Sequence, residues 1–312
     1  MNMSDTTIED FLFTKEFQNV DADVVAEELR NKGYFSFSKA FNTKAINAIE
    51  EDATKSKLNL NNNDVCGVYA ETQYHLTNLL SVSKTFFDFA TSNFVFDVCK
   101  KHLGSEFRLK ALRYYETYGG HHMQWHTDNK TDRGFADIPG IIIIFYISDV
   151  EDGQFQYIEG SHLWSGEKAY SDYSEEFINS EYKDKVRDFK LPSGSMVIYN
   201  TYGIHRAKPV FNKNFVRKSV FTQIDTQIND GEPIILNSKL ITKMNSDVAM
   251  FLGFGKPSNY VAYPPTSINS LPFTKNVLGI FFKYITHRFM RRVYDLSPHF
   301  VKSVVKKALR NS

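Results

Sequence analysis

The chain has 312 residues and a formal net charge of +1, so its overall charge does not indicate binding to nucleic acid. Hydrophobic residues make up 42% and aromatic residues 15% of the sequence, which is enough for a large packed core. Two cysteines without CxxC spacing argue against a disulfide framework or a structural zinc site. The first ten residues lack the pattern of a signal peptide, and the longest apolar run, 141–147, is too short to span a bilayer. We therefore expect a cytoplasmic protein.

The N-terminal third of the chain has helical character. The pattern predicts a helix over 21–32, a short strand over 34–37 and a second helix that begins after Asn42. Helical spacing returns over 82–102. The stretch 55–75 is polar and rich in asparagine, which favours a loop.

From Phe107 the pattern changes to short apolar segments separated by glycine-rich turns. Such a sequence of strands, preceded by helices, indicates a β-sandwich or barrel with helices packed on it. The continuously apolar segment is typical of a strand that is buried on both faces. Strands are expected over 107–118, 122–128, 141–148, 154–158, 195–199 and 216–224.

Three residues have the types and order of a metal site. His126 and Asp128 are two residues apart, so in a strand their side chains would point to the same face. A face of two histidines and one carboxylate, with open positions for other ligands, is typical of non-haem Fe(II) oxygenases. His205, which follows the strand predicted over 195–199, is the candidate for the second histidine. A His-x-Asp pair alone is common. The hypothesis of a metal site therefore depends on His205 and its position after the predicted strand.

Arg217 begins another predicted strand, twelve residues beyond His205. A fixed, bidentate cation near a metal suits the distal carboxylate of 2-oxoglutarate. Lys218 would point to the opposite face of the strand, and an ammonium is less suited to bidentate binding.

His122 and Gln124 are candidates for the substrate pocket. They share the face of the metal ligands if the strand is unbroken from 122 onward, and His121 would then point away from the metal. A β-bulge beside the site would reverse this alternation.

Five segments of the chain together suggest a known family: GYFSFSKAFNTKAINAIEEDA (33–53), WHTD (125–128), EDGQFQYIEGSH (151–162), SGSMVIYNTYGIH (193–205) and VRKSV (216–220). They resemble the phytanoyl-CoA dioxygenase family of Fe(II)/2-oxoglutarate-dependent oxygenases. The resemblance covers roughly residues 20–225 in the family's order and implies a mainly β fold, a double-stranded β-helix or cupin-like jelly roll with packed N-terminal helices.

The resemblance implies that His126, Asp128 and His205 bind Fe(II) and that Arg217 anchors 2-oxoglutarate, with O2 as the second cosubstrate. The family often has a serine two residues after the distal histidine that helps to hold 2-oxoglutarate. This chain has Ala207 there, so one hydrogen bond to the cosubstrate must come from elsewhere. The carboxylate at position 128 favours hydroxylation, because halogenating members carry a small residue in its place.

The expected function is a dioxygenase that hydroxylates a small or lipid-linked organic substrate and releases succinate and CO2. The alternative is a non-catalytic or non-redox jelly-roll protein, such as a cupin-like binding protein or an isomerase.

Charge is unevenly distributed along the chain. Residues 275–312 contain nine Lys or Arg and one acid, Asp295, so this segment carries +8 and the rest of the chain −7. We predict an oxygenase domain with its N-terminal helices over 1–225, an irregular connection over 226–274 and a basic amphipathic helical tail over 275–312. The tail would pack on the jelly roll, or make peripheral contact with an anionic membrane at its inner face, or bind an acidic partner. A nucleic-acid partner is not expected.

Overall fold

The computed structural model divides into two compact units, residues 1–269 and 270–312. The first unit carries the fold described here, and the described positions of the second are helical except for Ser297 and Pro298. The structure describes residues 7–58, 66–70, 72–77, 79–81, 83–128, 138–165, 173–226, 234–254 and 267–268, and positions 282, 285–286, 288–290, 292–293 and 296–298. In this part of the chain, no helix is both long enough and apolar enough to cross a membrane.

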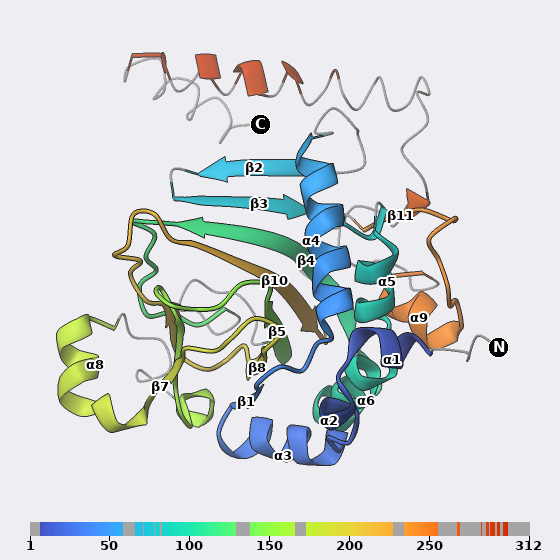
Figure 1. The fold of residues 1–312 in the computed structure, drawn as a ribbon. Helices are drawn as coiled ribbons and strands as arrows, with labels where there is room; N and C mark the ends of the chain where they lie inside the picture. The colour runs from blue at the N-terminus through green and yellow to red at the C-terminus, as the bar shows by residue number, and fades with distance from the viewer. Residues whose placement is uncertain are drawn as a thin grey trace, which may run out of the picture. The chain divides into compact units, whose positions relative to one another are not determined.

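Two antiparallel sheets form the centre of the first unit (Figure 1). The larger sheet has the order β1 (Tyr34–Phe37), β8 (Met196–Asn200), β5 (Gly140–Tyr146), β10 (Val216–Asp225), β4 (Arg108–Tyr118), β3 (Gln73–Thr77) and β2 (Cys66–Ala70). The smaller sheet has the order β7 (Val186–Phe189), β6 (Phe155–Ile158) and β9 (His205–Ala207). The two short strands β11 (Ile235–Leu236) and β12 (Ser267–Ile268) pair separately. The predicted mainly β jelly roll with packed helices is confirmed.

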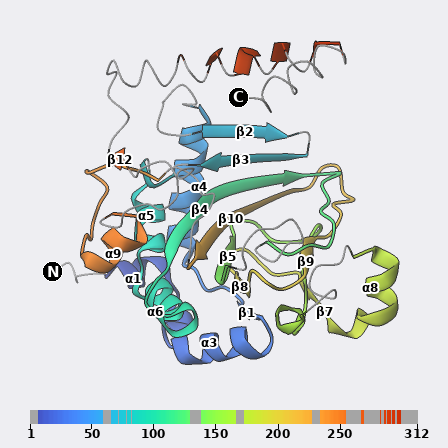
Figure 2. The same ribbon diagram turned by 180° about the vertical axis from the view of Figure 1, so that it is seen from behind.

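Helices cover one side of the large sheet, and the small sheet lies on the other side (Figures 1 and 2). The N-terminal helices are α1 (Ile8–Leu12), α2 (Lys15–Gln18), α3 (Ala22–Asn31), α4 (Thr43–Leu58), η1 (Leu79–Ser81), α5 (Lys84–Ala90) and α6 (Asn93–Leu103). The described residues between β6 and β7 include the short helices η2 (Ser161–Leu163), α8 (Glu175–Glu181) and η3 (Lys183–Lys185). Helix α9 (Ser246–Phe251) follows β11.

Strand β5 shows how the layers are held together. Ile141, Ile143 and Phe145 pack in the cluster that includes the helices. Ile142 and Tyr146 belong to the cluster shared with the small sheet. Because successive side chains of a strand point to opposite faces, a strand between two buried layers needs apolar residues at nearly every position. This explains the continuously apolar segment.

Two predicted boundaries differ from the structure. The helix expected over 82–102 is divided into α5 and α6, because Ser92 caps the second helix by accepting a hydrogen bond from the Val95 N–H. The stretch expected to be a loop over 55–75 contains the end of α4 and most of the β2–β3 hairpin. Its strand alternation is short, with Tyr74 and Leu76 buried, and the neighbouring asparagines obscure it in the sequence.

Within the segment 226–274, expected as an irregular connection, the described residues 234–254 contribute to the core. Leu236, Val248 and Phe251 are buried in the same cluster as the helices, and the Phe251 ring lies 5.1 Å from that of Phe96. The side chain of Asn245 caps α9. A six-residue helix and a two-residue strand are too short to produce a recognisable periodicity, so the sequence did not reveal them.

Gly33 connects α3 to β1 with a φ of +87°, and a Cβ at this position would lie 2.3 Å from the Tyr157 hydroxyl and 2.5 Å from His162 Nδ1. Gly104 has a similar φ of +91° but no atom within 4 Å of the corresponding Cβ. Both alanine variants are expected to be destabilised by backbone strain. Gly33→Ala should lose about 1–3 kcal/mol more than Gly104→Ala, because only the former overpacks its surroundings. Urea denaturation measures both, and equal losses would contradict this account.

Candidate metal and cosubstrate site

The segment before the first metal-ligand candidate contains a β-bulge. His126 and His205 each donate a backbone N–H to the other's carbonyl, at 3.0 and 2.9 Å. The Met123 N–H donates to the Ala207 carbonyl at 3.2 Å. Between these two hydrogen-bonded positions the chain advances by three residues on one side, from 123 to 126, but by only two along β9, from 205 to 207. One residue is therefore extra, which defines the bulge. The continuous strand predicted over 122–128 is interrupted here.

The bulge reverses which side chains face the inside. His121 and Met123 line the cavity beside the metal-ligand candidates. His122 and Gln124, the predicted pocket residues, are exposed and are not part of that lining. The expectation that His121 points away from the metal is also corrected. The physical reason in each case is the extra residue, which shifts the strand alternation by one position.

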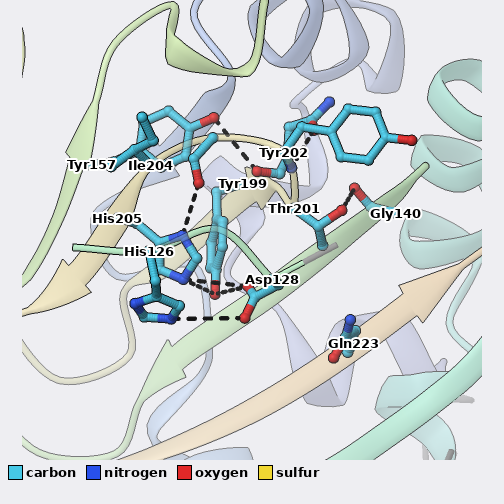
Figure 3. Close-up of polar contacts among 12 residues, drawn as sticks. His126, Asp128, Gly140, Tyr157, Tyr199, Thr201, Tyr202, Ile204, His205 and Gln223 are labelled. Carbon is cyan, nitrogen blue, oxygen red and sulfur yellow. Dashed lines mark hydrogen bonds and ion pairs between the residues drawn. The ribbon is translucent and has the colours of Figure 1, made fainter. Parts of the chain in front are cut away.

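The structure brings the three predicted metal ligands together (Figure 3). One ligand atom from each of His126, Asp128 and His205 lies within 4.8 Å of the other two. Nε2 of His205 is 3.2 Å from Asp128 Oδ2, and Nε2 of His126 is 3.9 Å from Asp128 Oδ1. The backbone holds this geometry, since the Asp128 N–H donates to the Thr201 carbonyl at 3.1 Å.

Backbone carbonyls set the orientation of both imidazoles. Nδ1 of His126 lies 2.7 Å from the Gln124 carbonyl, and Nδ1 of His205 lies 2.9 Å from the Gly203 carbonyl. A carbonyl can only accept, so each Nδ1 carries the hydrogen. In the neutral rings Nε2 is then the atom with a free lone pair, and it faces Asp128. This arrangement presents two nitrogens and one carboxylate to a single cation.

The charge states near neutral pH also suit a metal. Burial raises the pKa of Asp128, but His205 and His126 lower it by more, so the pKa lies below its usual value. Burial, and then the neighbouring His205, lower the pKa of His126. An ionised carboxylate and a neutral imidazole are the forms that bind metal ions.

Tyr199 of β8 is a further residue of the site that the sequence did not indicate. Its hydroxyl lies 3.4 Å from Asp128 Oδ2 and 3.4 Å from His205 Nε2 (Figure 3). Burial and the charge of Asp128 raise the pKa of Tyr199 well above its usual value, so it is a neutral phenol that can donate to the carboxylate.

A cavity of about 210 Å³ adjoins the triad and is lined by residues of both sheets. Arg217 of β10 lies in this lining and is buried. Its guanidinium donates to the Gly153 carbonyl and to Thr117 Oγ1, the latter at 3.4 Å. Lys218 points to the other face of the strand, where it pairs with Glu50 of α4.

Three buried polar atoms of this lining have no hydrogen-bond partner within the described part of the chain. They are Arg217 Nε, the Tyr146 hydroxyl and His121 Nε2. Burial, followed by the charge of Arg217, lowers the pKa of His121 to about 4, so its ring is neutral. Unsatisfied buried polar groups are costly, and their convergence on one cavity fits a polar ligand that completes them. Tyr146 is a candidate for the hydrogen bond that Ala207 cannot supply.

No family model matches the chain, and no curated protein matches it, but solved structures do. The carbocyclase SnoK from nogalamycin biosynthesis, described as non-heme and alpha-ketoglutarate dependent, has a TM-score of 0.52 and 12% identity over 69% of this chain and 86% of that chain. HygX from Streptomyces hygroscopicus, solved with nickel, 2-oxoglutarate and hygromycin B, has a TM-score of 0.52 and 14% identity over 68% and 90%. The epimerase SnoN from nogalamycin biosynthesis, also non-heme and alpha-ketoglutarate dependent, has a TM-score of 0.53 and 15% identity over 78% and 95%.

The chain therefore has the fold of the non-haem, 2-oxoglutarate-dependent enzymes. Identities of 12% to 15% establish the fold and leave reaction and substrate to be argued from the site.

Proposed function

We propose that this protein is an Fe(II)- and 2-oxoglutarate-dependent dioxygenase that hydroxylates a small organic molecule, and that it belongs to the phytanoyl-CoA dioxygenase family. The observation that carries the proposal is the convergence of His126, Asp128 and His205 at the edge of a cavity that also contains Arg217. The fold shared with SnoK, HygX and SnoN supports it.

The residues of the site would have three distinct roles, in binding the metal, binding the cosubstrate and orienting a metal ligand. His126, Asp128 and His205 would bind Fe(II) on one side and leave the other side to ligands from the cavity. Arg217 would hold the distal carboxylate of 2-oxoglutarate, with Tyr146 as a second donor. Tyr199 would donate to Asp128 and keep its carboxylate oriented. When bound, the iron supplies the oxidative chemistry with O2 and 2-oxoglutarate, and the products include succinate and CO2.

Anaerobic addition of Fe(II) and then 2-oxoglutarate to the metal-free protein tests this assignment. A weak visible charge-transfer band of the metal chelate is expected only when both are present, followed by succinate on exposure to O2. The alternative function, a non-redox or non-catalytic jelly roll, predicts neither the band nor succinate. A screen of small-molecule and lipid-linked candidates for stimulated succinate release would then identify the substrate.

The C-terminal segment supports a second proposal, peripheral binding to an anionic membrane. Five apolar side chains, spaced by three or four residues at helical positions, are between 45% and 85% exposed. Exposed Arg288 and Arg292 lie among them. Such an apolar stripe with flanking cations is typical of helices that lie in a lipid interface. The five residues are Phe282, Ile285, Phe289, Val293 and Leu296. Residues 299–312 of the predicted tail lie outside the described residues.

The full-length protein is expected to sediment with liposomes in proportion to their anionic lipid content and to be released by salt. Each cation near the surface contributes about 1 kcal/mol, so the double variant Arg288→Gln/Arg292→Gln should bind roughly tenfold to thirtyfold more weakly. Phe289→Ser should weaken binding to vesicles without removing its dependence on salt. A protein that ignores anionic liposomes would refute membrane binding and favour packing of the tail on the jelly roll.

A further inference from the structure

Two of the three proposed metal ligands lie on a backbone segment that is not part of a regular strand. His126 pairs with His205 as an isolated bridge, and the bulge lies directly beside this bridge. Asp128 lies in a bend two residues further on. Because a bulge disrupts the hydrogen-bond ladder locally, the distance of this segment from β9 depends on further contacts between side chains.

Arg206 provides such a contact on the outer face of the small sheet. It lies opposite Gln156 of β6, whose neighbours Phe155 and Tyr157 face the large sheet. By strand alternation, the Arg206 and Gln156 side chains therefore lie on the opposite face. There the Arg206 guanidinium carbon is 4.3 Å from the centre of the Trp125 ring, and both side chains are buried. A cation–π contact is strongest where water is excluded, and Trp125 directly precedes the first metal-ligand candidate.

The guanidinium of Arg206 is fixed in its plane. Its Nε donates to Gln156 Oε1 at 2.7 Å, and Nη1 and Nη2 both donate to the Glu175 carboxylate, the latter to Oε1 at 2.9 Å. The Gln156 amide in turn donates to Asp188 Oδ1 of β7 at 2.8 Å. Although Arg206 belongs to the cavity lining, all three guanidinium nitrogens donate to groups of the protein. A bidentate pair of this kind fixes orientation, so Arg206 is suited to support its neighbours.

Helix α8 supports Trp125 from the other side. Tyr173, two residues before the first residue of α8, pairs with Trp125 as an isolated bridge. Trp125 also belongs to the same small apolar cluster as Ile178 of α8. Figures 1 and 2 show α8 beside the small sheet. The residue before His126 is thus held by α8 and by the residue after His205.

We propose that Arg206 is a positioning residue of the metal site. Held by Glu175 and Gln156, it fixes Trp125 and thereby sets the position of His126 and Asp128 relative to His205. This inference rests on the proposed function. It also gives α8 a part in metal binding, although α8 supplies none of the proposed ligands.

Titration of the full-length, metal-free protein with Co(II) tests this role, because the visible d–d bands of Co(II) report its affinity and the arrangement of its ligands. Arg206→Gln should bind Co(II) about tenfold more weakly, as expected for the loss of a residue that supports metal ligands. The bands of the bound Co(II) should also change in position or intensity. Arg206→Lys keeps the charge but lacks the planar guanidinium, so its affinity should lie between the other two.

Trp125→Leu removes the ring beneath the guanidinium and should reproduce the changes of Arg206→Gln. Trp125→Phe keeps an aromatic face and should stay closer to wild type. Arg187→Gln is the matched control, because Arg187 belongs to β7 of the same sheet and pairs with Glu159. Its Co(II) affinity and bands should match those of wild type. Melting temperatures and 2-oxoglutarate binding are measured on the same samples.

A lower melting temperature of Arg206→Gln with unchanged Co(II) affinity and bands would make Arg206 a purely structural residue and overturn the inference. Weaker 2-oxoglutarate binding with unchanged Co(II) binding would make it a ligand contact, which also overturns it. If Arg206→Gln does not fold, Arg206→Lys and Trp125→Leu are judged by the same two criteria.

The inference and the proposed function fail in different ways. Co(II) and 2-oxoglutarate binding that does not depend on Arg206 rejects the inference alone. Co(II) binding that depends on Arg206, in a protein that forms no succinate with Fe(II), supports the inference and rejects the proposed dioxygenase. A wild-type protein that binds no Co(II) rejects both.

Discussion

Asp128→Ala is expected to reduce succinate formation to the uncatalysed background while leaving the protein folded. The variant removes the one carboxylate of the predicted metal face and leaves two imidazoles, so iron binding should weaken together with turnover. The fold should survive because the carboxylate contacts only groups of the site, His205, Tyr199 and His126, among the interactions described. His126→Ala should have the same effect on turnover.

Succinate release, bound iron after anaerobic loading and the melting temperature together separate these effects. Glu51→Gln is a suitable control, because it removes an exposed carboxylate that pairs with Lys55 on the surface of α4. If Asp128→Ala retained near-wild-type hydroxylation, the ligand assignment would be wrong. If it unfolded the protein, the carboxylate would have a structural role that the contacts do not indicate.

Arg217→Lys is expected to raise the concentration of 2-oxoglutarate needed for half-maximal turnover by ten- to a hundredfold. Lysine keeps the charge but lacks the planar guanidinium that can donate two parallel hydrogen bonds. A lost charge-assisted hydrogen bond costs about 1.5–3 kcal/mol. Iron affinity in the absence of 2-oxoglutarate should barely change, because Arg217 donates to Gly153 and Thr117 and not to a metal ligand. A change in the 2-oxoglutarate requirement without a change in iron affinity distinguishes a residue that anchors the cosubstrate from a metal ligand.

Lys218→Gln provides the neighbouring control, since Lys218 pairs with Glu50 on the opposite face of the sheet. Its 2-oxoglutarate dependence should match wild type. An unchanged 2-oxoglutarate requirement in Arg217→Ala would transfer the anchoring role to another cation. Because Arg217 is buried, the melting temperature of each variant is needed to exclude loss of the fold.

The sequence predicted residues whose chemistry and spacing are both distinctive. The order of His126, Asp128 and His205 led to the metal hypothesis, and the structure places their ligand atoms together. The opposite directions of Arg217 and Lys218 followed from simple strand alternation, which holds here because β10 pairs regularly with β4 at this point.

The same alternation failed at 122–128, because a bulge depends on the partner strand and leaves no local mark in the sequence. Tyr146 and Tyr199 were missed for a different reason. Each is an aromatic residue in an apolar strand, and only the tertiary structure shows that its hydroxyl faces the cavity or the triad. The resemblance to the phytanoyl-CoA dioxygenase family and the boundaries at 225 and 274 stay predictions.

The carbonyl that orients His126 has a consequence for how this chain could change over evolutionary time. The group belongs to Gln124, whose side chain is exposed and plays no part in the contact. Exchanges of that side chain should therefore be nearly neutral, whereas the deletion of one residue between 123 and 126 would restore regular pairing with β9 and move the carbonyl away from Nδ1. At this position selection would act on the length of the segment more strongly than on the identity of its residues.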